Sequence, residues 1–479
     1  MLYSTDDDLV VADLEIVYQK ELSECDRLTK SYESKLAVNP LLNRQLISFQ
    51  ANKIEPFYRW FKYKEGFSTS FVKHILSLFG KPNGKQVVLD PFSGIGTTLT
   101  TSNECGFDAI GIELLPHAIL AINARVASKS IDKFQIEAII EQLKSVNFSD
   151  KTVEQRFYFQ HLTITRGAFS GETEINLANF RKFLLEQSLT EEVRSLLSLI
   201  AISILEDVSF TRKDGQYLRW DSRSSRKLKS TFSKGTIYQF KEKLFDKLDQ
   251  IKVDLNHERK PTTNNKLNLI QGSCLTKLQE IKTGSVDLVI TSPPYCNRYD
   301  YTRTYALELA FTGVDDQAIK DLRQTLLSAT VENRSKFNEI ELLYKGRKRL
   351  KEFKAIAELH KSHPALNEII ENLNSNRESL NNTNIPQMIS NYFFEMNFVI
   401  HELSRTLKKG GKVIMVNDNV QYNGNEVPVD LILSDFANAA GLNTDTIWLL
   451  EKGKGNSSQQ MGIHGRNEIR KCVYVWSKN

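Results

Sequence analysis

Residues 90–99 read DPFSGIGTTL and follow a short apolar run, QVVL, at positions 86–89. The apolar run predicts a buried strand. The two glycines let the backbone behind it turn tightly and approach a ligand without a Cβ in the way. A second predicted strand, 106–113, ends in Glu113, and a carboxylate about 20 residues beyond such glycines is placed to hold two ribose hydroxyls. These segments predict the nucleotide-binding half of a Rossmann-like α/β sheet.

The residues that follow the two glycines distinguish three kinds of nucleotide site. A phosphate-binding P-loop needs a lysine after its last glycine, where this chain has Thr97. A pyrophosphate-binding loop needs a third glycine, where this chain has Leu99. The remaining interpretation is a loop for an adenosine ligand that carries no diphosphate, and S-adenosylmethionine fits that description.

A second motif, TSPPY at 291–295, follows the apolar run 286–290. Each proline fixes φ and lacks an N–H, so the chain leaves this strand in a rigid turn. Carbonyl and hydroxyl oxygens in the turn can accept hydrogen bonds from an exocyclic amine, and the Tyr295 ring can stack on a base. The alternative is an ordinary Pro-Pro turn with a surface tyrosine. Ligands bind at the carboxyl ends of strands in open α/β sheets, so we expect both loops to meet at one edge.

Together the two motifs resemble those of the DNA amino-methyltransferases, which methylate N4 of cytosine or N6 of adenine. In that family Ser-Pro-Pro-Tyr is commoner in N4-cytosine enzymes, and Asp or Asn in the first position is commoner in N6-adenine enzymes. The resemblance covers about 50–120, 266–312 and 386–479. It implies S-adenosylmethionine as the cofactor, DNA as the partner, and a cognate restriction endonuclease acting on the same site.

The same resemblance assigns roles to individual residues. The expected catalytic residues are Ser292, Pro293, Pro294 and Tyr295. The expected cofactor-binding residues are Phe67, Asp90, Phe92, Gly94, Gly96, Thr97, Thr98, Glu113 and Ser273. The family often has Asp where Ser273 stands, which makes the adenine contact at that position a departure from the pattern. We interpret Cys296 as a small packing residue, because it lies beyond the Pro-Pro-Tyr turn.

The positions of the motifs predict a sheet with helices on both faces, interrupted by two mainly helical insertions. About 150 residues separate Glu113 from the next predicted strand, far more than a loop needs. The expected parts are a helical N-terminal arm (1–49), a cofactor-binding half (50–130), a helical insertion (131–262), a catalytic-loop part (263–313), a charged helical insertion (314–385) and a C-terminal part (386–479).

The first insertion contains the strongest candidate for DNA contact. Residues 210–234 carry eight Lys or Arg against two Asp, interleaved with aromatic residues. Basic groups attract phosphates without regard to sequence, and aromatic rings stack on exposed bases. The alternative is a solvated surface loop. The expected DNA-binding residues are Arg212, Lys213, Tyr217, Arg219, Trp220 and Arg223.

Composition limits the class of protein. The net charge of +5 is mild and does not by itself imply nucleic acid. Five cysteines without a C-x-x-C pair predict neither a disulfide framework nor a zinc site, and they favour a reduced, cytoplasmic setting. The acidic start predicts no signal peptide, and no apolar run is long enough to span a membrane. Three alternatives to N4-cytosine methylation of DNA stay open: an N6-adenine enzyme, an RNA amino-methyltransferase, and an inactive nucleic-acid-binding subunit.

Overall fold

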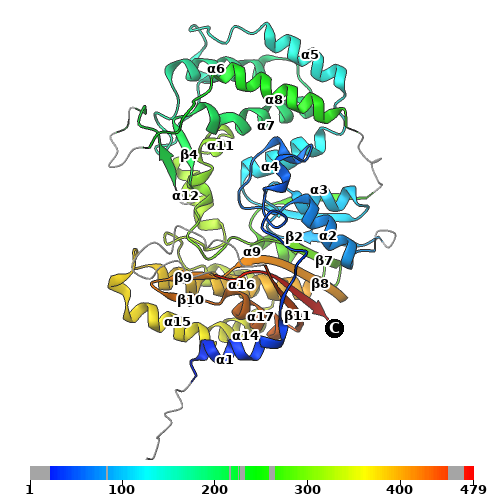
Figure 1. The fold of residues 1–479 in the computed structure, drawn as a ribbon, viewed down its shortest axis with the longest axis vertical. Coiled ribbons are helices and arrows are strands. Elements are labelled where there is room, and N and C mark those ends of the chain that lie inside the picture. Colours follow the sequence, from blue (N-terminus) through cyan, green and yellow to red (C-terminus); the bar gives the residue numbers. More distant parts are fainter. Residues whose placement is uncertain are drawn as a thin grey trace, which may run out of the picture.

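The chain folds around a sheet of eight strands, seen in a computed structural model that describes residues 22–81, 85–214, 217–224, 226, 232–257, 265–450 and 469–479 (Figure 1). The strand order is β1-β11-β12-β8-β7-β2-β3-β6. The strands are β1 (Leu36–Val38), β2 (Val87–Asp90), β3 (Asp108–Glu113), β6 (Leu267–Gln271), β7 (Val286–Thr291), β8 (Leu407–Asp418), β11 (Leu442–Leu449) and β12 (Lys471–Lys478). Neighbouring strands pair in parallel, except that β12 is antiparallel to both β8 and β11.

The strands β2 and β7 are neighbours at the point where the direction of strand addition reverses. From β2 the chain adds β3 and then β6 on one side, and from β7 it adds β8 on the other. Connections that leave in opposite directions open a crevice beyond the carboxyl ends of these two strands, and ligands bind in such crevices. The Rossmann-like α/β fold predicted from the sequence is confirmed by this order.

Helices cover both faces of the sheet because successive side chains of a strand point to opposite faces. Val88 and Leu288 pack on one face under α2, whereas Leu89 and Val289 pack on the other under α16 and α17. Both faces are therefore buried, which explains the near-continuous apolar runs of the strands. The helices next to the sheet are α2 (Thr69–Phe79), α3 (Thr97–Glu104), α4 (Pro116–Ala127), α9 (Cys274–Lys277), α16 (Ile385–Thr406) and α17 (Val429–Ala439).

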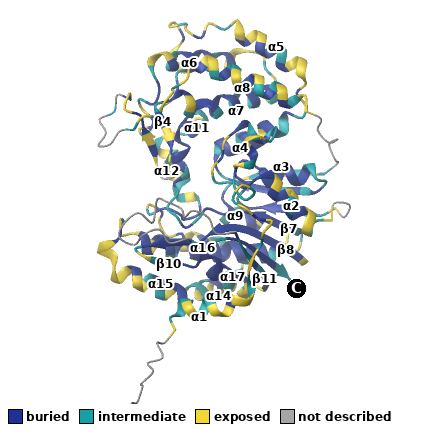
Figure 2. Cartoon of the chain, in the orientation of Figure 1, coloured by how far each residue is buried: buried dark blue, intermediate teal, exposed yellow. Residues whose placement is uncertain are grey.

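The first insertion forms a helical module beside the sheet (Figure 1). Its helices are α5 (Lys133–Lys144), α6 (Gly171–Glu186), α7 (Glu191–Val208) and α8 (Phe240–Leu255), and a hairpin of β4 (Thr211–Lys213) and β5 (Leu218–Trp220) projects from it. Asp132, Ser170 and Thr190 each accept a backbone hydrogen bond at a helix start, which fixes where three of the helices begin. The buried helix α7 packs against α4 and α11, so the module and the cofactor half share one hydrophobic core (Figure 2).

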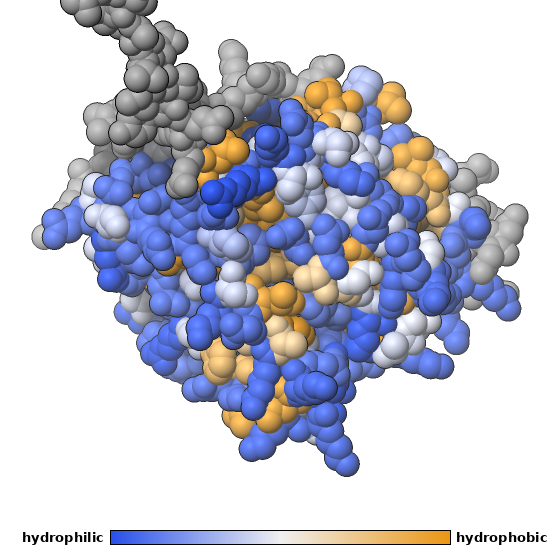
Figure 3. Space-filling view, turned by 90° about the horizontal axis from the view of Figure 1, so that it is seen from below, coloured by the Kyte–Doolittle hydropathy of each residue, from blue (hydrophilic) through white to orange (hydrophobic). Residues whose placement is uncertain are grey.

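The second insertion is also helical. After the short helices α10 (Tyr301–Thr304) and α11 (Ala306–Phe311) come α12 (Asp316–Thr325), α13 (Phe337–Gly346), α14 (Leu350–Lys361) and α15 (Pro364–Ser375). A small hairpin of β9 (Val420–Tyr422) and β10 (Asn425–Val427) follows β8. The face seen from below is mainly hydrophilic, with hydrophobic groups scattered across it (Figure 3). Among the described residues, no helix has both the length and the apolar character needed to cross a membrane.

The N-terminal arm differs from the helical segment predicted for 1–49. Residues 1–21 lie outside the described residues, and α1 (Glu24–Tyr32) is the expected helix. Residues Leu36–Val38 instead form β1, which pairs in parallel with β11 and adds an edge strand to the sheet. The pairing depends on an open sheet edge supplied by β11, in which Ile447 is the partner of Leu36. Three residues are too few to show a strand period. The helical assignment was wrong for this part of the arm.

Candidate active site and cofactor cavity

The two sequence motifs meet at the carboxyl edge of the sheet. The Thr291 hydroxyl donates a hydrogen bond of 2.7 Å to Oδ1 of Asp90, and both side chains are buried. The same carboxylate oxygen accepts the backbone N–H of Phe92 at 3.1 Å, which fixes the start of the glycine loop. Burial raises the pKa of Asp90 to about 6, although these hydrogen bonds lower it. Loops 200 positions apart therefore lie side by side, as the sequence predicted.

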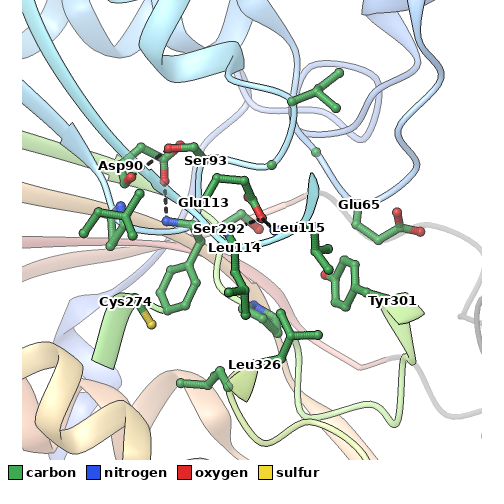
Figure 4. Close-up of a pocket in the computed structure, with 18 of the residues that line it drawn as sticks. Glu65, Asp90, Ser93, Glu113, Leu114, Leu115, Cys274, Ser292, Tyr301 and Leu326 are labelled. Carbon is green, nitrogen blue, oxygen red and sulfur yellow. Dashed lines mark hydrogen bonds between the residues drawn. The ribbon is translucent and has the colours of Figure 1, made fainter. Parts of the chain in front are cut away.

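A cavity opens where the loops meet, with about 770 Å³ of empty space that includes the part open to solvent (Figure 4). Seven of the nine expected cofactor-binding residues line it: Phe67, Asp90, Phe92, Gly94, Thr97, Glu113 and Ser273. Ser292 and Pro294 of the expected catalytic loop line it too. Strand order sets the positions along the cavity, because Ser292 follows β7, Glu113 ends β3 and Ser273 follows β6. A ligand in this cavity would therefore extend from the Pro-Pro turn, past Glu113, to Ser273.

Glu113 has the geometry of a ribose-binding carboxylate. Its Oε1 accepts the backbone N–H groups of Leu114 at 2.8 Å and Leu115 at 2.7 Å. These bonds fix the carboxylate at the cavity wall (Figure 4). Burial raises the pKa of Glu113 to about 7, against the lowering effect of the backbone hydrogen bonds. A carboxyl group with this pKa changes its charge near neutral pH.

The two glycines of the loop have different structural roles. Gly94 lines the cavity with φ +51°, and a Cβ there would lie 3.0 Å from Cε1 of Tyr63. Gly96, with φ +77°, does not line the cavity, and a Cβ there would lie 2.7 Å from the Ile122 side chain. Thr98 also lies away from the cavity wall and donates a hydrogen bond of 3.1 Å to the Ile290 carbonyl. Gly96 and Thr98 therefore support packing of the helix behind the loop.

A second pocket adjoins the first on the side of the Pro-Pro turn. Ser292 and Tyr295 line it, together with Asn297, Tyr299 and Asp418. The Ser292 hydroxyl lies 3.4 Å from the Tyr295 hydroxyl. Both pockets are lined by Glu65, Gly66, Ser292 and Tyr301, so these residues form the shared wall. Pro293 is buried, and the turn presents its serine between two cavities.

Several residues at the site were missed by the motif search. Glu65 lines both pockets and accepts a hydrogen bond of 2.7 Å from the Tyr305 hydroxyl. Leu326 and Leu327 reach the first cavity from the second insertion. Glu65 lies in the range 50–120 that the family resemblance covers, whereas the two leucines lie outside every range it covers. Cys296 is buried, as predicted for a packing residue, and burial raises its thiol pKa.

The basic run of the first insertion divides into exposed and buried residues. Arg212, Tyr217 and Arg219 lie at the surface of the β4–β5 hairpin. Lys213 is buried, and its Nζ lies 2.5 Å from Oε1 of the buried Glu308. Exposed and buried residues alternate along the hairpin, because successive side chains of a strand point to opposite faces.

Two more residues of the expected DNA-binding set are engaged within the protein. Trp220 is buried, with the Arg226 guanidinium 4.2 Å above its ring. Arg223, which is half exposed, forms an ion pair with Asp221 at 2.7 Å. Four of the six expected DNA-binding residues are therefore exposed, and Lys213 and Trp220 are buried. Of the exposed four, Arg219 also pairs with Asp214, at 3.5 Å. Among the described residues, no group of His, Cys, Asp and Glu has the arrangement of a metal site.

Comparison with known proteins gives concordant matches. Residues 23–124 match the family described as DNA methylase. Over 473 residues the chain is 41% identical to the Type II methyltransferase M.AvaI of Nostoc sp., an alignment that covers 96% of this chain and 95% of that protein. M.AvaI of Anabaena variabilis gives the same identity and coverage. The Type II methyltransferase M.BsoBI of Geobacillus stearothermophilus is 40% identical over 471 residues, covering 94% and 91% of the two chains.

Proposed function

Because this chain belongs to the N6/N4 DNA methylase family, whose cofactor is S-adenosylmethionine, we propose that it methylates the exocyclic N4 of cytosine in DNA. The similarity to type II methyltransferases over nearly the whole chain supports a role as the modification enzyme of a restriction–modification system, with a cognate endonuclease as partner. The observation that carries the proposal is the position of Ser292 in the wall between a ligand cavity and a second pocket.

The residues that line the first cavity offer the chemistry that the cofactor requires. Glu113 offers a fixed carboxylate to the ribose hydroxyls, and Gly94 leaves room for close approach of the loop backbone. Gly66 and Phe67 line the end near the Pro-Pro turn, where the methionine part would lie. S-adenosylmethionine supplies a methyl group already activated by its sulfonium, so the protein's main task is to position the amine.

The second pocket fits an extruded base. A base inside a duplex cannot reach the cofactor and must leave the stack. Tyr295 then stacks on the base, while the Ser292 hydroxyl and the Pro293 carbonyl accept the two amine hydrogens. These hydrogen bonds draw the nitrogen toward tetrahedral geometry and free its lone pair for in-line attack. The N–C bond forms as the C–S bond breaks, and one N–H proton leaves after transfer.

The choice of N4-cytosine over N6-adenine rests on Ser292. Serine is a neutral acceptor, and Ser-Pro-Pro-Tyr is commoner among N4-cytosine enzymes of the resembling family. For DNA contact we propose the exposed residues Arg212, Tyr217 and Arg219, and we assign the module 131–262 to recognition of the duplex.

One experiment tests the reaction and the base together. The purified protein is incubated with tritiated cofactor and plasmid DNA or total RNA, and the nucleic acid is digested to nucleosides. We expect the label in N4-methyl-2′-deoxycytidine from DNA. Label in N6-methyladenine would show that adenine, not cytosine, is the target base. Label in RNA would show that RNA is the substrate. Absence of label from both would contradict the enzymatic role.

The Ser292→Ala variant tests the proposed role of the serine hydroxyl. We expect a fall in methylation of roughly 100-fold, the scale seen when one oriented hydrogen-bonding group is removed from a transition state. Binding of S-adenosylhomocysteine, measured by calorimetry, should stay unchanged. Ser375→Ala, an exposed serine on α15, is the matched control. Equal loss of activity and of cofactor binding in Ser292→Ala would point to a structural role instead.

A further inference from the structure

The end of the first cavity beyond Glu113 is covered by the second insertion. Ser273 follows β6, the edge strand beside β3, so this end receives the part of the cofactor beyond the ribose, which is the adenine. The Ser273 hydroxyl donates its hydrogen bond to the Thr325 carbonyl at 3.1 Å. The next two residues, Leu326 and Leu327, line the cavity, and Leu326 is labelled in Figure 4. Ser273, where the family often has Asp, therefore anchors a segment that enters the cavity from outside the two sequence motifs.

This segment, residues 323–336, is called the strap. Its first residue is tied to the loop that follows the Pro-Pro turn, because Arg323 pairs with Asp300 at 3.1 Å and donates to the Thr302 hydroxyl at 2.9 Å. The Asn333 amide closes the strap on itself through a hydrogen bond of 2.7 Å to the Arg323 carbonyl. The strap thus connects the adenine end of the cavity with the residues beyond Tyr295.

A buried ionic cluster fixes the other end of the strap. Lys336 Nζ lies 2.8 Å from Oε1 of Glu395 on α16, and both side chains are buried. The Ser328 backbone N–H and hydroxyl donate to the same carboxylate at 2.8 and 2.5 Å, and Lys336 donates to the Ser328 hydroxyl at 2.8 Å. Burying two charges is costly unless their hydrogen-bonding positions are filled, as they are here. A cluster of this kind specifies one position for the residue next to Leu327.

We propose that the strap is a cofactor-binding element, in which Leu326 and Leu327 pack on the adenine ring and the Lys336–Glu395–Ser328 cluster holds them in place. The inference rests on the proposed assignment of the first cavity to S-adenosylmethionine. Two leucines also suit an adenine site, because apolar side chains that pack against the face of a flat heteroaromatic ring contribute to its binding. The second insertion then contributes to methyl-donor binding as well as to the fold.

The first test uses two ligands that share the adenosine group. The Leu327→Ala variant is titrated with S-adenosylhomocysteine and with 5′-methylthioadenosine, which lacks the amino-acid part. We expect both dissociation constants to rise about tenfold, the effect of losing part of one buried leucine contact. Leu342→Ala, an exposed leucine on α13 of the same insertion, is the matched control and should leave both unchanged. Unchanged binding in Leu327→Ala, or a loss confined to S-adenosylhomocysteine, would overturn the assignment.

The second test addresses the ionic cluster. The Lys336→Met variant leaves Glu395 without its cation and is expected to lower the melting temperature, so the double variant Lys336→Met/Glu395→Gln removes both charges together. In the folded double variant we expect both ligands to bind about tenfold more weakly. Binding as tight as in the parent protein would refute the positioning role of the cluster.

A third variant tests the assignment of the first cavity to S-adenosylmethionine separately from the strap. The Glu113→Ala variant lacks the proposed ribose contact and leaves the strap unchanged. If S-adenosylhomocysteine binds this variant as tightly as the parent, the cavity itself is misassigned. If the strap variants bind S-adenosylhomocysteine normally and Glu113→Ala does not, the cavity assignment is supported and the strap proposal is refuted.

Discussion

At the scale of single residues, Gly94 has a positive φ and no space for a side chain. Substitution by valine should abolish cofactor binding, because the residue sits at φ +51° and its Cβ would press on the Tyr63 ring at 3.0 Å. Calorimetry with S-adenosylhomocysteine measures the effect. Gly410→Val is the matched control, since Gly410 has φ +76° with open space around it and bears only the backbone strain. Tight binding by Gly94→Val would contradict the role of the loop.

Glu113 predicts a pH dependence of cofactor binding. Burial raises its pKa to about 7, so the free protein holds a proton on this carboxyl below neutral pH. Ribose hydroxyls donate to the ionised form, and binding at pH 6 must first remove that proton. We therefore expect S-adenosylhomocysteine to bind about tenfold more weakly at pH 6 than at pH 8.

The Glu113→Gln variant is the control for this pH dependence, because it removes the titrating group and keeps its size. Asp90, whose pKa burial raises to about 6, is present in both proteins, so the difference between them isolates Glu113. Parallel pH profiles in the two proteins would show that another group is responsible.

At the scale of elements, the β4–β5 hairpin allows the proposed DNA contact and the stability of the fold to be tested at adjacent residues. Lys213→Met should lower the melting temperature, because it leaves the buried Glu308 without its partner, a change that costs about 3–5 kcal/mol. Arg212→Ala, one residue earlier and exposed, should leave the melting temperature unchanged. It should weaken DNA binding and reduce the slope of log affinity against log salt by about 1.

Thermal unfolding and DNA titrations at several salt concentrations measure both effects on the hairpin. Each variant is the control for the other. Arg212 and Lys213 are adjacent and both positively charged, but only Lys213 is buried. A stable Lys213→Met protein with reduced salt dependence would reverse the assignment of the two side chains.

At the scale of the whole molecule, the first insertion belongs to the same core as the cofactor half. The helix α7 packs against α4, which follows the Glu113 strand, and against α11, which follows the Pro-Pro-Tyr loop. Replacing residues 131–257 by a short linker should therefore expose an apolar face and yield an insoluble or unfolded chain. Soluble expression and circular dichroism measure this outcome against the full-length protein. A soluble fragment that binds S-adenosylhomocysteine would show that the module folds apart from the sheet.

Much of the site could be predicted because its chemistry is encoded locally. The loop after β2 carries its glycines, the loop after β7 carries its prolines and serine, and each follows a short apolar strand. Parallel strands bring their carboxyl ends to one edge, so local signals sufficed to predict that Asp90 and Ser292 would lie at the same site. The helical character of residues 131–262 was also predicted, and α5, α6 and α7 form there.

The remaining features depend on contacts between distant parts of the chain. The burial of Lys213 and Trp220, the arrival of Leu326 and Leu327 at the cavity, and the pairing of β1 with β11 carry no local signature. The density of charge in 210–234 gave no information on which side chains are exposed. In the hairpin, alternate side chains point toward the protein. The sequence alone determined which backbone turns and functional groups the two loops contain, because those depend on neighbouring residues. Only the tertiary structure decided which side chains share the cavity, because packing places residues by their partners in space.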